Sequence, residues 1–407
     1  MNLPFAMPIG LPFEVDAFGR VALLLIMSIA AAEVCERWLR LPRLIGYVLA
    51  GLLLGPSMLG LVPSSVTGDL RPLVLLGLGL LLFELGSRVD LRWLRHNPML
   101  IVSSLVESAL TFTATFIFLG WFDLAMGTRV AVAAIAVSTS PAVVMRIVAE
   151  NNARGQLTER LMLMTTLNSL YAILLLKISV GVVHLDRNAG LLQTIGHPAY
   201  IAFGSFLLGA AIAYAMHLAR FSQLKRESER FTLVIAVVLL GTTAADRLGL
   251  SVPMALLCGG MILRSLSQRL HLFPEHFGAA GALLVIVLFT LTGVALDPRH
   301  IVAGGLMSIG LLLIRGLAKY VGAYVSAGYG GLVPKKAAWL GVALLPMSSL
   351  AVLQAHDVAG LYADFGADVL TIVLGAVLIM ELLGPVATQI ALRRSGEAMP
   401  SPGEREV

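Results

Sequence analysis

The chain has 407 residues, of which 58% are hydrophobic and only 13% are charged, and its mean hydropathy is +0.88. Soluble domains carry roughly 25% charged residues, so this composition excludes a soluble fold. In a soluble protein a net charge of +5 would suggest acidic partners such as nucleic acid. In a membrane protein basic residues mainly set orientation, and we therefore interpret the charge as topology.

Apolar runs bounded by charges, prolines or glycines divide the chain into thirteen candidate membrane spans. A helix needs roughly 20 apolar residues to cross the hydrocarbon core, so thirteen spans fit this length with short loops. The sequence predicts an all-α polytopic protein with one membrane domain over residues 1–394 and a short tail over 395–407. The predicted spans are 17–37, 43–60, 71–88, 98–121, 127–149, 158–184, 197–220, 231–247, 251–267, 277–297, 301–327, 335–357 and 363–393.

The distribution of lysine and arginine supports this count. When alternate loops are assigned to alternate sides, twenty basic residues fall on one side and six on the other, with three inside spans. Cytoplasmic loops hold the excess of basic residues. We therefore expect the N-terminus outside and the C-terminal tail in the cytoplasm, in a cell (inner) membrane.

Two spans are interrupted near their middle by proline next to hydroxyl residues. Proline removes a backbone donor and clashes with the preceding turn, and the hydroxyls can satisfy the freed backbone groups. A simple kink is the alternative interpretation. Matching positions in the fifth and twelfth spans favour two inverted six-helix repeats, 1–6 and 8–13, joined by span 7. The residues of these breaks are Ser138, Thr139, Ser140 and Pro141, and Pro346, Ser348 and Ser349.

Five ionisable side chains inside spans are candidates for function, because charge within a membrane is costly. Glu84 can carry a proton, bind a cation or pair with a nearby base. Glu107 can act in transport or be a protonated group bonded to a neighbouring helix. For Glu381, before a Gly-Pro pair, we favour a structural role. Arg315 and Lys319 share one helical face and can compete with a transported cation, pair with its acidic ligand or anchor the helix.

The sixth span contains polar residues, Asn168 and Ser169 among them, in an otherwise apolar helix. Neutral oxygen donors of this kind suit a weakly held alkali cation, although they do not carry a proton near neutral pH. Interhelical hydrogen bonds are the alternative interpretation.

Several motifs, in the right order, resemble the cation:proton antiporter superfamily, and within it the Kef-type monovalent cation:proton antiporter-2 family with its sodium/hydrogen exchanger domain. The resemblance covers nearly the whole chain. It implies thirteen helices, crossed broken helices, a core and a dimerisation domain, a homodimer and elevator-like alternating access. The motifs are LPRLIGYVLAGLLLGPSMLG, LLFELGSRVDL, STSPAVVMRIVAEN, LTERLMLMTTLNSL, LLIRGLAKYVGA and ELLGPVATQIALRRSGE.

Carried over by position, the resemblance implies an ion site without cofactor or resident metal, and Glu84 matches an acidic position of the exchanger branch. Transport-competent members usually have aspartate as the second residue of the paired motif, where this chain has Ser169. The other residues of the implied site are Thr139, Ser140, Asn168 and either Arg315 or Lys319.

The leading hypothesis is exchange of Na+ or K+ for protons, with Glu84 and Lys319 or Arg315 replacing the lost aspartate. The alternative is a member that no longer antiports and acts as a channel-like cation pathway, a membrane sensor or a partner subunit. An enzyme has little support, because the chain contains no HExxH and no GxSxG motif.

Overall fold

The computed structural model describes residues 17–63, 68, 70–185, 191–219, 226–266 and 278–398. Within these ranges every regular element is a helix. Each of the thirteen predicted spans matches one helix or, in the fifth and twelfth, a pair of half-helices. The predicted all-α polytopic fold is confirmed. Residues 399–407 of the predicted tail lie outside the described residues.

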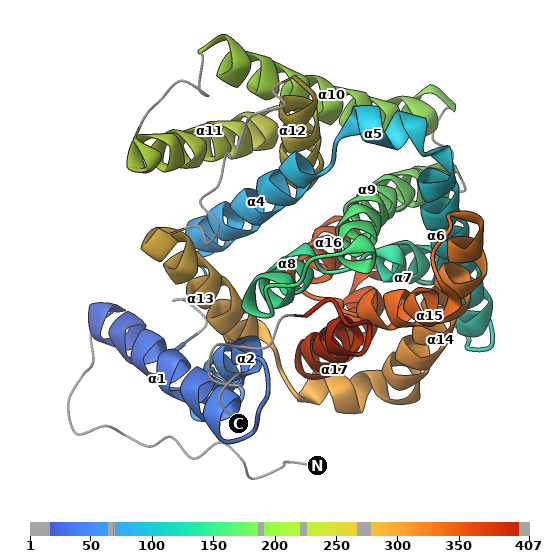
Figure 1. Cartoon of the computed structure of the whole chain (residues 1–407). Coiled ribbons are helices and arrows are strands. Elements are labelled where there is room, and N and C mark those ends of the chain that lie inside the picture. Colours follow the sequence, from blue (N-terminus) through green and yellow to red (C-terminus); the bar gives the residue numbers. More distant parts are fainter. Residues whose placement is uncertain are drawn as a thin grey trace.

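Figure 1 shows two groups of helices, which we call the core bundle and the panel. The panel curves around one side of the core bundle, and α9–α10, α4–α8 and α2–α17 are contacts across the boundary. A short helix, α5 (Leu91–His96), leads from the panel into the core bundle. The core bundle consists of α6 (Pro98–Leu119), α7 (Met126–Val137), α8 (Pro141–Glu150), α9 (Gln156–Leu185), α14 (Arg299–Tyr329), α15 (Pro334–Ala343), α16 (Ser349–Leu361) and α17 (Gly366–Arg394). The panel consists of α1 (Ala17–Arg37), α2 (Arg43–Leu54), α4 (Arg71–Arg88), α10 (Leu191–Leu218), α11 (Glu227–Arg247), α12 (Val252–Leu266) and α13 (Gly278–Ala295).

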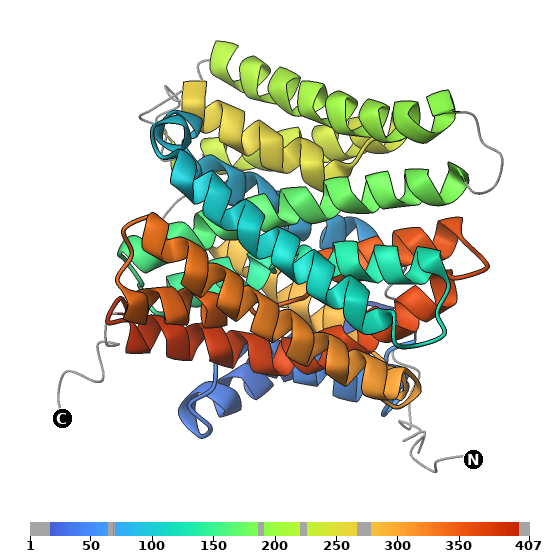
Figure 2. The ribbon, with the colours of Figure 1, turned by 90° about the vertical axis from the view of Figure 1, so that its right-hand side faces the viewer.

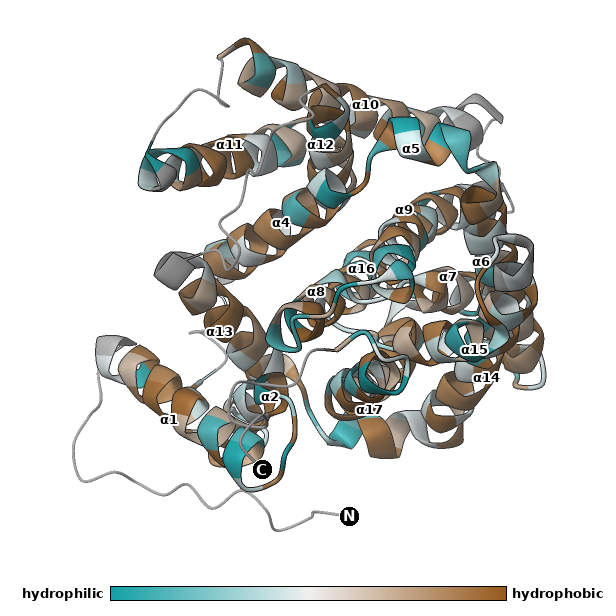
Figure 3. Ribbon diagram, in the orientation of Figure 1, coloured by the Kyte–Doolittle hydropathy of each residue, from teal (hydrophilic) through white to brown (hydrophobic). Residues whose placement is uncertain are grey.

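The outer faces of the helices are apolar. Figure 2 shows the long helices running across the view in about the same direction, and Figure 3 shows apolar residues along their lengths. Large hydrophobic side chains are exposed on α10 and α14, among them Phe203 at 64% and Leu313 at 68%. Within the described residues, seven segments are long and apolar enough to cross a membrane, and three shorter helices are also apolar. These faces fit contact with lipid, so the chain is a multi-pass membrane protein.

Glycine lets two panel helices pack backbone against backbone. A Cβ atom added to Gly86 of α4 would lie 2.2 Å from the carbonyl oxygen of Leu257, and one added to Gly260 of α12 would lie 2.2 Å from that of Phe83. Small residues at helix contacts allow this approach in membranes. Any larger residue at either position would push α4 and α12 apart.

The two predicted breaks are confirmed, and they meet. The first separates α7 from α8 at residues 138–140, and the second separates α15 from α16 at residues 344–348. The backbone N–H of Ser140 donates to the carbonyl of Pro346 at 2.9 Å, and the Thr139 hydroxyl donates to the carbonyl of Leu344 at 3.1 Å. The extended segments of the two broken helices therefore cross inside the core bundle.

The residues after α17 turn back and bind the N-terminus of α9. The Glu397 carboxylate accepts hydrogen bonds from the backbone N–H of Leu157 and Thr158, from the Thr158 hydroxyl, and from Lys336 at the start of α15. Burial alone would raise the pKa of Glu397, but Lys336 and these donors outweigh burial and hold the pKa below its usual range. The anion thus caps α9 and joins the ends of three core helices.

Candidate functional site

The helix crossing places several carbonyl oxygens without intrahelical partners in the interior of the core bundle. The last carbonyls of a helix lack hydrogen-bond donors and carry the negative end of the helix dipole. The half-helices α7 and α15 both end at this point, at Val137 and Ala343. These ends of α7 and α15 therefore attract cations.

Arg315 of α14 supplies one of these cations and binds both breaks. Its Nε donates to the carbonyl of Ala136 at 2.7 Å and its Nη2 to that of Ser138 at 2.6 Å. Its Nη1 donates to the carbonyl of Leu345 at 2.6 Å, and Nη2 reaches that of Pro346 at 3.5 Å. The planar guanidinium has enough donors to hold all four oxygens at once.

Lys319, one helical turn further along α14, forms a buried ion pair with Glu107 of α6. The ammonium Nζ lies 2.7 Å from the Glu107 Oε1 atom, and neither side chain is exposed. The same ammonium donates to the carbonyl of Val137 at 2.9 Å and to the hydroxyl of Thr139 at 3.2 Å. The ammonium therefore lies among three oxygens from a carboxylate, a carbonyl and a hydroxyl.

Asn168 of α9 holds the other oxygen of the same carboxylate. Its Nδ2 donates to the Glu107 Oε2 atom at 2.7 Å and lies 3.4 Å from the Thr139 hydroxyl. Its Oδ1 accepts hydrogen bonds from Ser104 and Ser108 of α6, each at 3.1 Å. The carboxylate is thus fixed from two sides by α9 and α14.

The remaining predicted residues of the first break also line the crossing. The Ser140 hydroxyl caps α8 by accepting from the N–H of Val143 at 3.4 Å, and Pro141 is the first residue of that helix. The Ser169 hydroxyl donates to the carbonyl of Thr165 at 2.8 Å and approaches that of Thr139 at 3.3 Å. An aspartate in place of Ser169 would therefore put a second carboxylate against this break.

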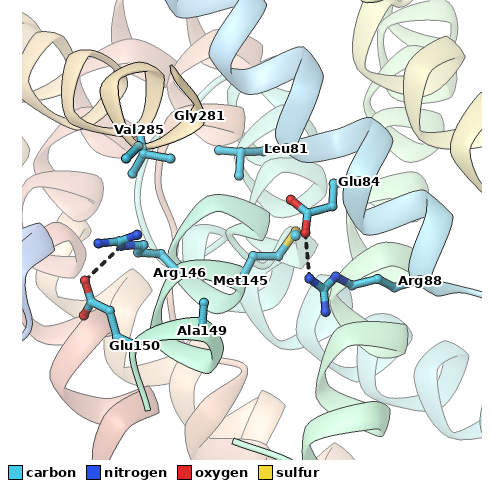
Figure 4. A pocket seen from close by; sticks show the side chains of 10 residues that line it. Leu81, Glu84, Arg88, Met145, Arg146, Ala149, Glu150, Gly281 and Val285 are labelled. Carbon is cyan, nitrogen blue, oxygen red and sulfur yellow. Dashed lines mark hydrogen bonds and ion pairs between the residues drawn. The ribbon is translucent and has the colours of Figure 1, made fainter. Parts of the chain in front are cut away.

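Glu84 lies elsewhere, in a pocket between α4 and α8. Its Oε1 pairs with Arg88 at 2.6 Å, and Arg146 pairs with Glu150 at 2.9 Å on another wall (Figure 4). The pocket has a volume of about 220 Å³, and a neighbouring pocket of about 180 Å³ extends it toward Arg154. Both are smaller than a typical site for a drug-sized ligand. The leading hypothesis required Glu84 to act together with Lys319 or Arg315. The structure does not bring these groups together.

The second break holds its own carboxyl group. The Ser348 hydroxyl lies 2.6 Å from Glu381 Oε1 on α17 and 3.3 Å from the Ser349 hydroxyl. Ser349 is the first residue of α16, and Pro346 contributes its carbonyl to Ser140 and Arg315. The sequence favoured a structural role for Glu381, and in the structure its side chain contacts Ser348 of the second break.

The sequence left open whether Glu107 is structural, and in the structure its carboxylate forms the ion pair with Lys319. The signal was a polar face on α6, because Ser104 lies three residues before Glu107 and Thr111 four residues after it, at helical spacing. Gly322 of α14 allows the contact, since a Cβ atom there would lie 2.7 Å from the Glu107 Cα atom. The identity of the partner helix was the missing information.

Comparison with known proteins identifies the family. The profile described as sodium/hydrogen exchanger, transmembrane, matches residues 22–394. The chain belongs to this family. The sodium/hydrogen exchangers are transporters rather than enzymes, and the family's substrates are sodium ions and protons. A search of curated proteins found no match.

Two solved structures of a sodium proton antiporter, MjNhaP1 from Methanocaldococcus jannaschii, share the fold of this exchanger-family chain. The structure at pH 8 is 19% identical, covers 94% of this chain and 99% of that chain, and gives a TM-score of 0.69. The structure from an electron-microscopy map is 17% identical, covers 95% and 99%, and gives a TM-score of 0.70. The predicted antiporter-like fold is confirmed, and cation:proton antiport is the activity of this family.

Proposed function

We propose that this chain exchanges a monovalent cation, Na+ or K+, for protons, and that Glu107 replaces the aspartate missing at Ser169. The observation that carries the proposal is the buried contact of 2.7 Å between Lys319 Nζ and Glu107 Oε1. Cation and proton compete for a carboxylate in such a scheme. The carboxylate comes from α6 instead of α9.

The Lys319 ammonium and the transported cation compete for the carboxylate of Glu107. Its ammonium lies among the carboxylate of Glu107, the carbonyl of Val137 and the hydroxyl of Thr139, all hard oxygen donors that suit an alkali ion. An arriving cation displaces the ammonium from the carboxylate. A lysine that loses its counter-ion in an apolar interior favours the neutral form and releases its proton.

The other predicted site residues have supporting roles in this scheme. Asn168 orients Glu107, while Thr139, Ser140 and Ser169 present oxygen atoms at the first break. Glu84 lies in the pocket between core bundle and panel, where a carboxylate attracts a cation before it enters the crossing.

The proposal also includes the more specific predictions made from the sequence, on the family branch, the repeats, the dimer, the substrate and the orientation. The six motifs support the Kef-type branch, and the matched breaks support two inverted repeats with interleaved core and dimerisation domains. The resemblance also implies a homodimer and K+ as an alternative substrate. The excess of basic residues supports a cell (inner) membrane location with the N-terminus outside.

The test is cation-driven proton movement in proteoliposomes that contain a pH-sensitive dye. We expect Glu107→Gln to lose exchange in Na+ and in K+ gradients, because glutamine keeps the shape and carries no charge. Glu159→Gln, at an exposed position near the start of α9, is the matched control and should behave as wild type. Exchange by Glu107→Gln at the wild-type rate would refute the role of Glu107.

One observation favours the second candidate, a passive pathway or a sensor. Lys319 already fills the oxygen cluster, and Ser169 offers no second carboxylate to release it. Electrogenic cation flux without proton movement would establish a channel, and no flux together with a stably bound partner would establish a sensor. Gain of exchange only in Ser169→Asp would show that the missing carboxylate had disabled transport.

A further inference from the structure

Glu381 is a fully buried carboxyl group without a charged partner. Its exposed fraction is 0%, the same as that of Glu107. The Glu381 Oε1 atom lies 2.6 Å from the Ser348 hydroxyl, while Oε2 has no hydrogen-bond partner, and no ion pair to Glu381 occurs among the described residues. Glu107, by contrast, has an ammonium and an amide on its two oxygens.

The charged groups on the helices that pack against α17 are held at other places. The guanidinium of Arg315 binds carbonyls of Leu345 and Pro346, just before Ser348. Of the others, Lys319, Arg146, Lys336 and Arg43 pair with acids, Arg129 lies over Phe116, His356 bonds to the carbonyl of Val352, and Arg299, His300, Lys335 and Asp357 lie toward helix ends.

An ionised carboxylate without a partner is very costly in an apolar interior, and such a group takes up a proton instead. The N-terminus of α16 offers partial compensation, since it begins at Ser349. That terminus is a fraction of a charge, however, and it reaches Glu381 only through the Ser348 hydroxyl. A neutral, protonated Glu381 accounts for the absence of a counter-ion.

A row of hydroxyl groups leads from this carboxyl group to the panel. Ser348 lies 3.3 Å from Ser349, and Ser349 lies 3.5 Å from Thr292 of α13. Thr292 in turn donates to the carbonyl of Leu288 at 2.8 Å. In the two hydroxyl pairs either oxygen can be the donor. While the Thr292 hydroxyl donates to Leu288, Ser349 is the donor to Thr292, so the direction of the row reverses only when Thr292 turns its O–H away from the Leu288 carbonyl.

The oxygen–oxygen distance is short at the Glu381 end of the row and long at the Thr292 end. Good hydroxyl hydrogen bonds are about 2.7–2.8 Å long, so the 3.5 Å contact is made only weakly in this conformation. This contact crosses from the core bundle to the panel, as the positions of α16 and α13 in Figure 1 show. A small shift between the two groups of helices is enough to close or open the row.

We propose that Glu381 is a second proton-binding site, and that Ser348, Ser349 and Thr292 pass its proton across the boundary between core bundle and panel. The site is distinct from the Lys319–Glu107 pair: Glu381 belongs to α17, and its carboxyl group contacts Ser348 of the second break. Only the consequence for transport rests on the proposed exchange function: Glu381 then adds a proton to those that Lys319 and Glu107 handle.

The test is infrared difference spectroscopy of the full chain in liposomes, which detects the carbonyl stretch of a protonated carboxyl group. We expect this band in wild type and in Glu107→Gln, and its loss in Glu381→Gln. Equal absorbance in wild type and Glu381→Gln at every pH that supports folding would overturn the site. Ser348→Ala, which keeps the carboxyl group, should shift the band without removing it.

Transfer along the row is tested by the rate at which the band shifts after a change to D2O. We expect a several-fold slower shift in Thr292→Val, because valine has the shape of threonine without the hydroxyl. Thr290→Val is the matched control on the same helix, since Thr290 bonds to Ser28 outside the row. Equal rates in wild type and Thr292→Val would overturn the transfer path. Because neither measurement uses ion flux, failure of the exchange proposal leaves both readouts intact.

Discussion

The two broken helices cross at one place, and each break has a buried carboxyl group beside it. The partners of these two carboxyl groups differ. At the first break, Glu107 is paired with Lys319 and held by Asn168. At the second break, Glu381 is equally buried and has one hydroxyl neighbour. Burial without pairing favours a neutral acid, while burial with pairing fixes two opposite charges. The presence of a charged partner, more than the degree of burial, therefore decides whether the carboxyl group at each break is charged or neutral.

The largest expected effect separates these two cases by stability. Lys319→Met leaves the Glu107 carboxylate without its cation, and breaking a buried ion pair costs about 3–5 kcal/mol. Glu381→Gln breaks no ion pair and should cost much less. Thermal unfolding in detergent measures both, and the double variant Lys319→Met with Glu107→Gln is the control that should recover most of the loss. Equal destabilisation by Lys319→Met and Glu381→Gln would contradict the comparison.

Arg315→Lys tests the connection between the breaks. Lysine reaches fewer of the four carbonyls, and each charged hydrogen bond that is not remade costs about 1.5–3 kcal/mol. We expect a lower unfolding temperature and weaker exchange. Arg299→Lys, at the exposed start of α14, is the matched substitution and should change neither. An unchanged unfolding temperature in Arg315→Lys would show that these bonds do not hold the crossing together.

Gly322→Ala tests the close contact of α14 with α6. The added methyl group would lie 2.7 Å from the Glu107 Cα atom, and overpacking of this kind costs about 1–3 kcal/mol. We expect reduced stability and slower exchange, because the helices that carry Lys319 and Glu107 move apart. Gly328→Ala is the control on the same helix, where an added Cβ meets nothing within 4 Å. Identical behaviour of the two alanine variants would sink the prediction.

The smallest expected effect concerns Glu397, outside the crossing. Its pKa is held below the ordinary value of 4.5, so the carboxylate contributes stability above that value and the contribution disappears as pH falls through the lowered pKa. Glu397→Gln should cost about 1 kcal/mol at neutral pH, the scale of an anion at a helix N-terminus. Unfolding temperatures of wild type and variant should converge in acid. Lys335→Met is the control, and a constant difference at all pH values would rule out the carboxylate.

Local signals in the sequence were sufficient for the architecture. Thirteen apolar runs and two prolines beside hydroxyls each depend only on nearby residues, and the helices follow them. The spacing of four residues also predicted that Arg315 and Lys319 share one face of α14, and the family resemblance implied that one of them lies at the ion site.

The partners of these groups were not predictable in the same way. Glu107 and Glu84 both lie in apolar runs, and only the packing of α6 against α14 selects the first as the partner of Lys319. The capping of α9 by Glu397 likewise depends on a turn that returns over a distance of 240 residues. Residue spacing along one helix predicts which side chains share a face. Which helix packs against that face depends on the tertiary structure.

The four carbonyl contacts of Arg315 have a mechanical consequence. One planar group holds the ends of both half-helices, so separating them requires the loss of several charged hydrogen bonds together. The crossing therefore moves as one rigid unit, and any displacement changes the contacts at its edges instead. Those edges include the 3.5 Å contact between the Ser349 and Thr292 hydroxyls, which is longer than a good hydroxyl hydrogen bond.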